Sequence, residues 1–119
     1  MATVLTQVGE EWIVDKLDES VATLPDDVGS GTGAGTAAKA DTALFTEVTE
    51  ARAVATLSQP AADKLRAVGT QTFTGTKTIT NAGNFTAPTG GTLVVHGEFA
   101  GISVNNNDKI EFTIDLEIT

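Results

Sequence analysis

The sequence contains no cysteine and no tyrosine, and it has only one histidine and one tryptophan among its 119 residues. Without cysteine the chain can form no disulfide, no thiolate metal site and no cysteine nucleophile. Any acid–base or metal site built on imidazole would have to use His96, the single histidine. These absences remove several kinds of catalytic centre before any motif is considered.

Basic residues are also scarce, because 7 Lys and Arg stand against 16 Asp and Glu, for a net charge of −9. A phosphate backbone is held by clustered Lys and Arg, so we expect no nucleic-acid partner. No apolar run approaches the roughly 20 residues that cross a bilayer, so we expect no membrane partner. The first twelve residues lack the basic head and apolar stretch of a signal peptide. We therefore expect synthesis in the cytoplasm without Sec-type export.

What the chain has in quantity is threonine, with 20 residues, and glycine, with 12. Its length predicts a single domain over residues 1–119. Composition divides this domain into an N-terminal arm and helix (1–27), a glycine-rich loop segment (28–50) and a β-sandwich core (51–119). Residues 28–36 alternate glycine with small side chains, which predicts a loop or an irregular edge segment.

A short helix is predicted near the N-terminus. Leu5, Val8 and Trp12 recur at helical spacing, and the acids at 10 and 11 suit a first turn. This pattern predicts a helix over residues 7–19. We expect Trp12 to be a packing anchor and, with Leu17, to dock the helix.

The rest of the chain is typical of strands. Residues 110–118 alternate apolar and polar side chains without exception, which predicts a half-buried antiparallel strand. The polar run 105–108 before it favours a tight turn. Further strands are predicted at 51–58, 65–74, 76–85, 93–95 and 102–104. Their regular spacing indicates a mainly β fold, an antiparallel β-sandwich or jelly-roll-like domain with a short N-terminal helix.

The glycine run and the histidine are the first candidates for chemistry. The run GSGTGA at 29–34 matches G-x-G-x-x-[GA], but Asp26 and Asp27 stand where a dinucleotide site needs a buried strand. We interpret it as a loop. A catalytic role for His96 would need a hydroxyl and a carboxylate beside it. At the end of a predicted strand, His96 is more typical of a surface or interface residue.

Clustered oxygen ligands and carboxylates are the remaining candidates. Asp26 and Asp27, and the run 105–108, offer oxygen ligands but lack the spacing of a calcium loop, so turn chemistry explains them. Glu111, Asp115 and Glu117 share one strand face, which would need an aromatic-lined cleft to hydrolyse a glycoside. We interpret that face as solvated. The sequence therefore predicts no enzyme activity, no cofactor and no metal site.

Three groups of motifs resemble those of small virion structural proteins of tailed bacteriophages. They are EEWIVDKL at 10–17, the pattern GTG…DTAL at 31–44 followed by Glu47 and Arg52, and the C-terminal runs GTKTI at 75–79, GGTL at 90–93 and NDKIEFT at 107–113. The resemblance implies a β-rich decoration or cement protein on the capsid surface of the virion. Its implied partners are the major capsid protein and its own copies, in a homotrimer. No catalytic residue is implied.

We expect contacts with the lattice or with other copies in the N-terminal arm and the glycine-rich loop, because these segments have the least reason to be fixed in isolation. The residues concerned are Thr3, Val4, Leu5, Val8, Trp12, Gly31, Thr32 and Gly33. Two alternatives stay open. One is a phage tail or baseplate subunit, and the other is a carbohydrate-binding or adhesive module, which would need exposed aromatic rings or a calcium loop.

Overall fold

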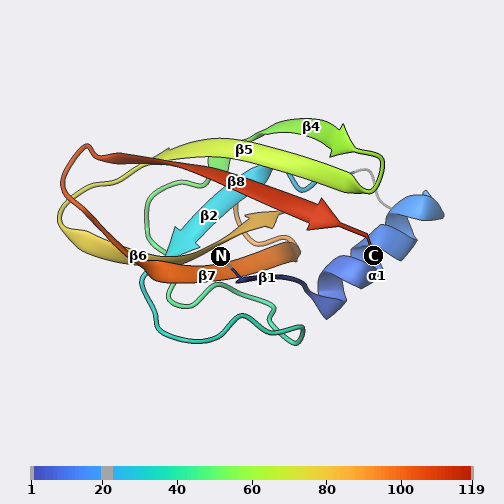
Figure 1. Cartoon of the computed structure of the whole chain (residues 1–119), viewed down its shortest axis with the longest axis horizontal. Helices are drawn as coiled ribbons and strands as arrows, with labels where there is room; N and C mark the ends of the chain where they lie inside the picture. Colours follow the sequence, from blue (N-terminus) through green and yellow to red (C-terminus); the bar gives the residue numbers. More distant parts are fainter. Residues whose placement is uncertain (1, 20–22, 119) are drawn as a thin grey trace.

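Two antiparallel sheets and one helix make up the computed structural model, which describes residues 2–19 and 23–118 (Figure 1). The sheets pack against each other as a sandwich, which confirms the predicted mainly β class with a short N-terminal helix. The five-stranded sheet has the order β1 (Ala2–Leu5), β7 (Leu93–Val104), β6 (Lys77–Phe85), β2 (Asp27–Gly31) and β3 (Ala53–Val54). The three-stranded sheet has the order β4 (Thr56–Ala61), β5 (Lys64–Thr72) and β8 (Lys109–Glu117).

The main core lies between the two sheets. In β8 the side chains of Phe112, Ile114 and Leu116 are buried, while those of Glu111 and Thr113 are exposed. The predicted alternating strand is thus confirmed. Its apolar side chains are removed from water together with partners from the other sheet, which is the main stabilising contribution of the fold. Those partners include Val28, Ile79, Val94 and Val104.

Two of the predicted strands differ in extent. The separate apolar runs at 93–95 and 102–104 belong to one strand, β7, because β6 pairs with both halves across a register shift between Ile79 and Asn81. The weak run at 51–58 forms two strands, β3 and β4, one in each sheet. Strand β4 includes Pro60, which an edge strand with a register shift tolerates.

Helix α1 (Gln7–Leu17) begins after Thr6, whose Oγ1 accepts a hydrogen bond from the N–H of Gly9. The Trp12 side chain is only 9% exposed, and its Nε1 donates to Thr23 Oγ1, so its role as a packing anchor is confirmed. The expected docking role of Leu17 is wrong, because this side chain is 79% exposed. At about 100° per residue Leu17 lies roughly 140° around the helix from Trp12.

The first residues are part of the sheet, and not a free arm as predicted. Strand β1 pairs antiparallel with β7, with Thr3 opposite Gly97 and Leu5 opposite Val95. The fully buried Thr6 hydroxyl donates to the carbonyl oxygen of Leu93. The arm prediction failed because the threonine-rich start reads as polar, whereas its backbone supplies the edge of a sheet.

The beginning of the predicted glycine-rich loop is also strand. Residues Asp27–Gly31 form β2, which lies between β6 and β3 and is buried throughout. Glycine is required here by close approach, because a Cβ on Gly31 would collide with the carbonyl oxygen of Phe45. The rest of the predicted loop, residues 32–50, forms no regular helix or strand, as expected, apart from one isolated bridge between Gly31 and Glu47.

Candidate functional site

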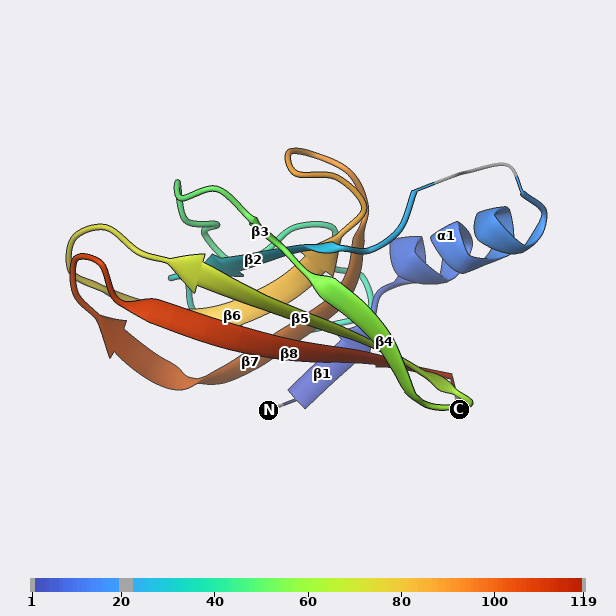
Figure 2. The same ribbon diagram turned by 90° about the horizontal axis from the view of Figure 1, so that it is seen from above.

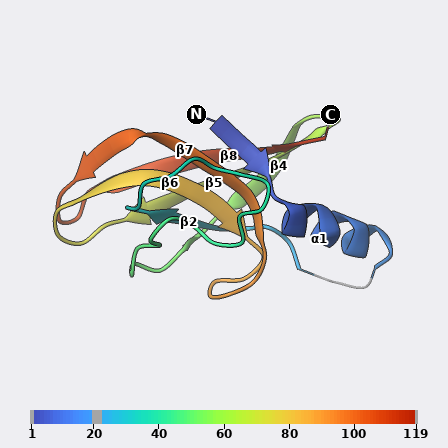
Figure 3. The ribbon, with the colours of Figure 1, turned by 90° about the horizontal axis from the view of Figure 1, so that it is seen from below.

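Residues 32–50, here called the covering segment, run across the face of the five-stranded sheet that is turned away from the three-stranded sheet (Figure 3). Leu44 of the covering segment packs with Phe85 and Leu93 in a second apolar cluster. The N–H of Val48 donates to the carbonyl oxygen of Ser30, and that of Gly33 to Phe45. Both faces of the five-stranded sheet are therefore covered.

His96 lies in β7 beneath the covering segment and is fully buried. Its Nδ1 is 2.7 Å from Asp41 Oδ2, and its Nε2 is 3.0 Å from Asn81 Oδ1. The ring of Phe45 meets the imidazole edge to face, with centroids 4.7 Å apart. The prediction that His96 is a surface or interface residue is wrong for this chain, because residues that are distant in sequence cover it.

The amide of Asn81 is oriented by the backbone of Phe45. The Phe45 N–H donates to Asn81 Oδ1 at 3.0 Å, and Asn81 Nδ2 donates to the Phe45 carbonyl oxygen at 3.1 Å. This orientation leaves an oxygen facing Nε2 of His96, while a carboxylate oxygen faces Nδ1. Both ring nitrogens of the buried imidazole therefore have an oxygen atom within hydrogen-bond distance.

This cluster has part of the geometry of a catalytic triad, because a carboxylate orients a histidine. A triad also needs a hydroxyl or thiol on the second ring nitrogen. In this chain that nitrogen, Nε2, bonds to the amide of Asn81, and the ring has no exposed surface. The cluster of His96, Asp41 and Asn81 is therefore arranged to hold the covering segment on β6 and β7.

Further contacts fasten the later part of the covering segment. Arg52 Nε donates to Glu47 Oε2 at 2.7 Å, and its guanidinium lies 3.5 Å above the ring centroid of Phe85. The same guanidinium donates to the carbonyl oxygens of Ala87 and Gly90. Asp41, Glu47 and Arg52 all belong to the motifs that carry the phage resemblance. In the structure all three attach the covering segment to the sheet and its adjoining loop.

Glu50 ends the covering segment with a largely buried ion pair. Lys77 Nζ lies 2.6 Å from Glu50 Oε2, and the N–H of Thr74 donates to the same oxygen. Burial by itself raises the pKa of Glu50, but the hydrogen bonds from Lys77 and Thr74 outweigh it, so the pKa is lowered below the ordinary value of 4.5. The carboxylate is thus held in its charged form.

A groove of about 660 Å³, here called the edge groove, lies between β1, α1 and the end of β8. Its charged residues are engaged within the chain: Glu10 pairs with Lys39 at 2.8 Å and Asp115 with Arg66 at 2.8 Å. The hydrogen bonds from Arg66 lower the pKa of Asp115. These carboxylates therefore already have partners, and the groove combines paired charged side chains with apolar ones. Its apolar lining consists of Leu5, Ile13, Val95, Leu116 and Ile118.

In the described part of the chain, no group of three or more His, Cys, Asp or Glu side chains lies close enough together to bind a metal ion. The carboxylates of Glu111, Asp115 and Glu117 lie along one face of β8, as predicted, and Glu111 is exposed. Within residues 2–19 and 23–118, no helix combines the length and the apolar character needed to cross a membrane.

The predicted contact residues do not form one surface. Thr3 and Leu5 line the edge groove, whereas Gly31 lies in β2, which β7 and β6 separate from β1. Thr3 and Thr32 are exposed, Val4, Leu5, Val8 and Gly33 are half-buried, and Trp12 and Gly31 are buried. Their role in lattice or subunit contact stays a prediction.

No protein-family model matches the chain, and no curated protein matches it. The cluster around His96 was missed by sequence reasoning because Asp41 lies 55 positions away. One signal could have indicated it: Asn81, Asn84 and His96 interrupt strands that are otherwise apolar or small, as happens when polar groups are buried beneath a further layer.

Proposed function

We propose that this protein is a non-enzymatic structural protein of a tailed-phage virion, which binds the assembled capsid lattice as a decoration or cement protein. The motif resemblance supports this role. The structural observation that carries it is the exposure of apolar side chains on α1, where Val14 is 63% and Leu17 is 79% exposed. Leu24, in the chain that returns from the helix, is 46% exposed.

Helix α1 projects beyond the end of the two sheets (Figure 2), and it carries the exposed side chains of Val14 and Leu17. Large apolar side chains that share an exposed surface are typical of protein–protein contact sites. Glu10 and Glu11 lie one turn before Val14 on the same side of the helix, so the exposed apolar side chains have acidic neighbours. We therefore propose that α1 and the adjoining Leu24 meet the capsid, at an apolar site with a basic rim.

A small contact is sufficient for this kind of role. A decoration protein binds the assembled shell and not the free subunit, so the shell is stabilised by mass action. Any pairing between neighbouring copies raises their retention further, because the second contact becomes intramolecular. The sandwich behind α1 then serves as a rigid body that tolerates display on the outside of the particle.

The test uses two variants of matched charge in purified particles of the phage that carries the gene. Leu17→Glu places a charge in the proposed contact, while Val54→Glu places one on β3, where Val54 is 80% exposed. We expect the Leu17 variant to fall at least tenfold in copies per particle and the Val54 variant to remain at the wild-type level, both measured by quantitative gel or mass spectrometry.

Copy number also separates the alternatives. Hundreds of copies per head support a decoration protein, whereas a handful located on the tail would replace it with a tail or baseplate subunit. Normal decoration by the Leu17→Glu variant would reject α1 as the contact. Strong binding on a glycan array, with no protein on the head, would favour the carbohydrate-binding module.

A further inference from the structure

Strand β8 has a long free edge. The three-stranded sheet has the order β4-β5-β8, so β8 pairs with β5 on one side and with no strand of the described chain on the other. Its nine residues pair with β5 without a register shift and contain no proline. An edge of this kind exposes a row of N–H and C=O groups that can pair with another chain.

The other edges of the two sheets are short or interrupted. Strand β4 contains Pro60 and a register shift, strand β3 has two residues, and strand β1 has four. Short length, proline, bulges and charged side chains are the usual ways in which an edge is protected from pairing. Among the described strands, β8 is the long edge without proline or a register shift, and its charged side chains are of both signs.

We propose that β8 pairs antiparallel with β8 of a second copy, around a two-fold axis at Phe112, and so joins the two three-stranded sheets into one sheet of six strands. This inference goes beyond the proposed lattice role and does not rest on it.

The backbone groups that face the free edge follow from one hydrogen bond. The N–H of Ile118 donates to the carbonyl oxygen of Asp63, on the β5 side. Successive residues of a strand point their N–H and C=O groups to opposite sides. Since those of Ile118 point toward β5, the backbone groups of Glu117 face the free edge. The same holds at every second residue toward the start of β8: Asp115, Thr113, Glu111 and Lys109.

Charge selects the register. Antiparallel pairing that keeps the apolar side chains on one face, and that joins at least seven of the nine residues, places the axis at Phe112, Thr113 or Ile114. An axis at Thr113 sets Lys109 opposite Glu117 of the second copy but also sets Glu111 opposite Asp115, and an axis at Ile114 sets Glu111 opposite Glu117. Like charges directly opposite destabilise a pair of strands.

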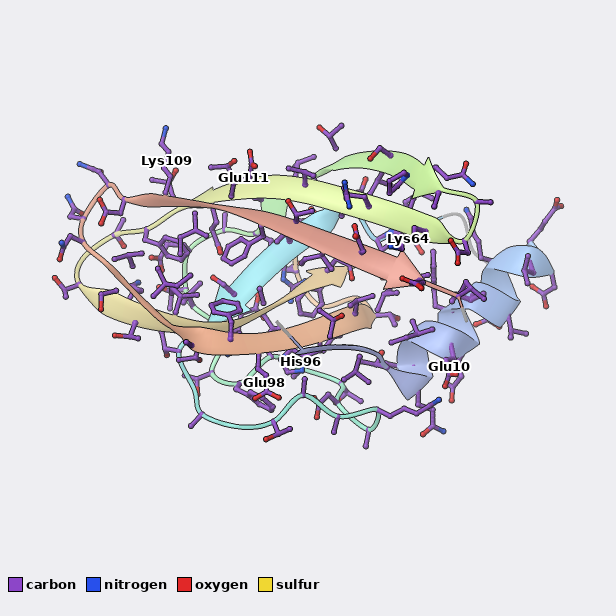
Figure 4. The ribbon with its side chains drawn as sticks, in the orientation of Figure 1. Glu10, Lys64, His96, Glu98, Lys109 and Glu111 are labelled. Carbon is purple, nitrogen blue, oxygen red and sulfur yellow. The ribbon has the colours of Figure 1, made fainter. Side chains whose placement is uncertain are left out.

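The axis at Phe112 avoids both conflicts. It sets Glu111 opposite Thr113 and Lys109 opposite Asp115 of the second copy, twice each because of the symmetry. Within the described chain neither Lys109 nor Glu111 forms an ion pair, and both side chains point away from the sheets (Figure 4). Asp115 already bonds to Arg66, so Lys109 of the second copy would add an ion pair to an ordered carboxylate.

The overall charge of −9 does not oppose this contact. The three strands of this sheet carry three basic and three acidic side chains, so the sheet itself is neutral. The excess of acid lies elsewhere in the chain. The six side chains are Lys64, Arg66, Lys109, Glu111, Asp115 and Glu117.

The core also reaches the proposed axis. Half-buried Phe99 of β7 lies beside Phe112, with ring centroids 6.4 Å apart. A second copy paired at Phe112 places its own Phe99 and Phe112 next to these rings. The half-buried ring of Phe99 is then covered by aromatic side chains of both copies.

The first test measures the mass of the purified protein by light scattering. We expect twice the 12.2 kDa of one chain. Lys109→Glu sets Glu opposite Asp115, and we expect it to raise the dimer dissociation constant at least tenfold, whereas the same change at the exposed Lys39 leaves it unchanged. A mass of one chain, or of the three chains that the phage resemblance implies, overturns the proposal.

The second test fixes the register, and the natural absence of cysteine makes it clean. Glu111→Cys and Thr113→Cys, two exposed positions, are purified separately, checked for folding by circular dichroism, and then oxidised alone and mixed. Directly opposite residues lie about 5.5 Å apart between Cα atoms, within the range of a disulfide. We expect a covalent dimer in the mixture only. Crosslinking of Thr113→Cys alone, or no crosslink in the mixture, overturns the axis at Phe112.

A third variant blocks the edge without touching the fold. The N–H of Thr113 faces the free edge, so Thr113→Pro removes no hydrogen bond to β5 and obstructs an added strand. We expect a monomer with an unchanged circular dichroism spectrum, and a dimer that survives this change contradicts the proposal. All three tests use the isolated protein, so they succeed or fail independently of capsid binding.

Discussion

The Nδ1 atom of His96 lies 2.7 Å from the Oδ2 atom of Asp41, although 55 positions separate the two residues. This contact joins the covering segment, which has no regular secondary structure, to a central strand of the larger sheet. Since the ring is fully buried, Nδ1 of His96 cannot turn to water when Asp41 is removed. The stability of the covering segment should therefore depend on this pair.

Replacing His96 with alanine is expected to destabilise the fold by about 2–4 kcal/mol, because Asp41 and Asn81 lose a partner and a cavity remains. The measurement is the free energy of unfolding in urea. Val54→Ala, at an exposed position, is the control and should change it by less than about 0.5 kcal/mol. A similarly small change for His96→Ala would show that the cluster contributes little.

Asp41→Asn keeps the shape of the side chain but removes its charge. We expect the covering segment to open locally, because an amide in place of the carboxylate weakens the contact with the buried Nδ1 atom of His96. Hydrogen exchange measured by mass spectrometry should then rise at least tenfold at residues 37–46. Exchange in β8, which Asp41 does not contact, provides the internal reference, and equal protection of the covering segment in both proteins would contradict this role.

Acid should weaken the protein through Glu50. Its pKa is lowered in the folded state, so as the pH falls through about 4.5 the unfolded chain takes up the proton first and unfolding becomes more favourable. The stabilisation from Glu50 is complete above the pKa of this carboxyl in the unfolded chain. It is lost as the pH falls through the lower pKa of the folded state. We expect Glu50→Gln to flatten this part of the profile of unfolding free energy against pH. Val54→Ala, which removes an exposed side chain without a titratable group, should leave the profile as in the wild type.

Gly9→Ala should destabilise the protein, although alanine normally favours a helix by about 1 kcal/mol over glycine. A Cβ at this position would lie 2.6 Å from the carbonyl oxygen of Val94, so α1 would have to move away from β7. We expect a loss of about 1–3 kcal/mol and a red shift in the fluorescence of Trp12, the single tryptophan. A gain in stability would show that the helix can shift without cost.

The elements that the sequence predicted correctly are those whose signal is local. The alternation at 110–118 gave β8, and the run 105–108 gave its turn, where Asn107 has a φ of 71° and the N–H of Asn105 donates to Asp108 Oδ2. Helical spacing of apolar residues predicted α1 and the burial of Trp12. These patterns reflect contacts within one element or its nearest neighbour.

What could not be predicted depends on residues far apart in sequence. The glycine run reads as a loop because its small side chains have little to bury, yet β2 needs them because the covering segment crosses it closely. Nothing near His96 indicates Asp41 or Asn81, since neither is adjacent to it in sequence. The exposure of Leu17 depends on which side of the helix meets β7, and apolar spacing alone left two sides possible.

The covering segment also sets how the molecule could be divided. Residues 34–36 are exposed, and they follow β1, α1 and β2 in the chain. A protease cut there would leave two pieces that still share the β1–β7 and β2–β6 hydrogen-bond ladders, because β2 inserts between β6 and β3. The nicked protein is therefore expected to stay assembled, and this position is a natural place to split the chain into two fragments that find each other again.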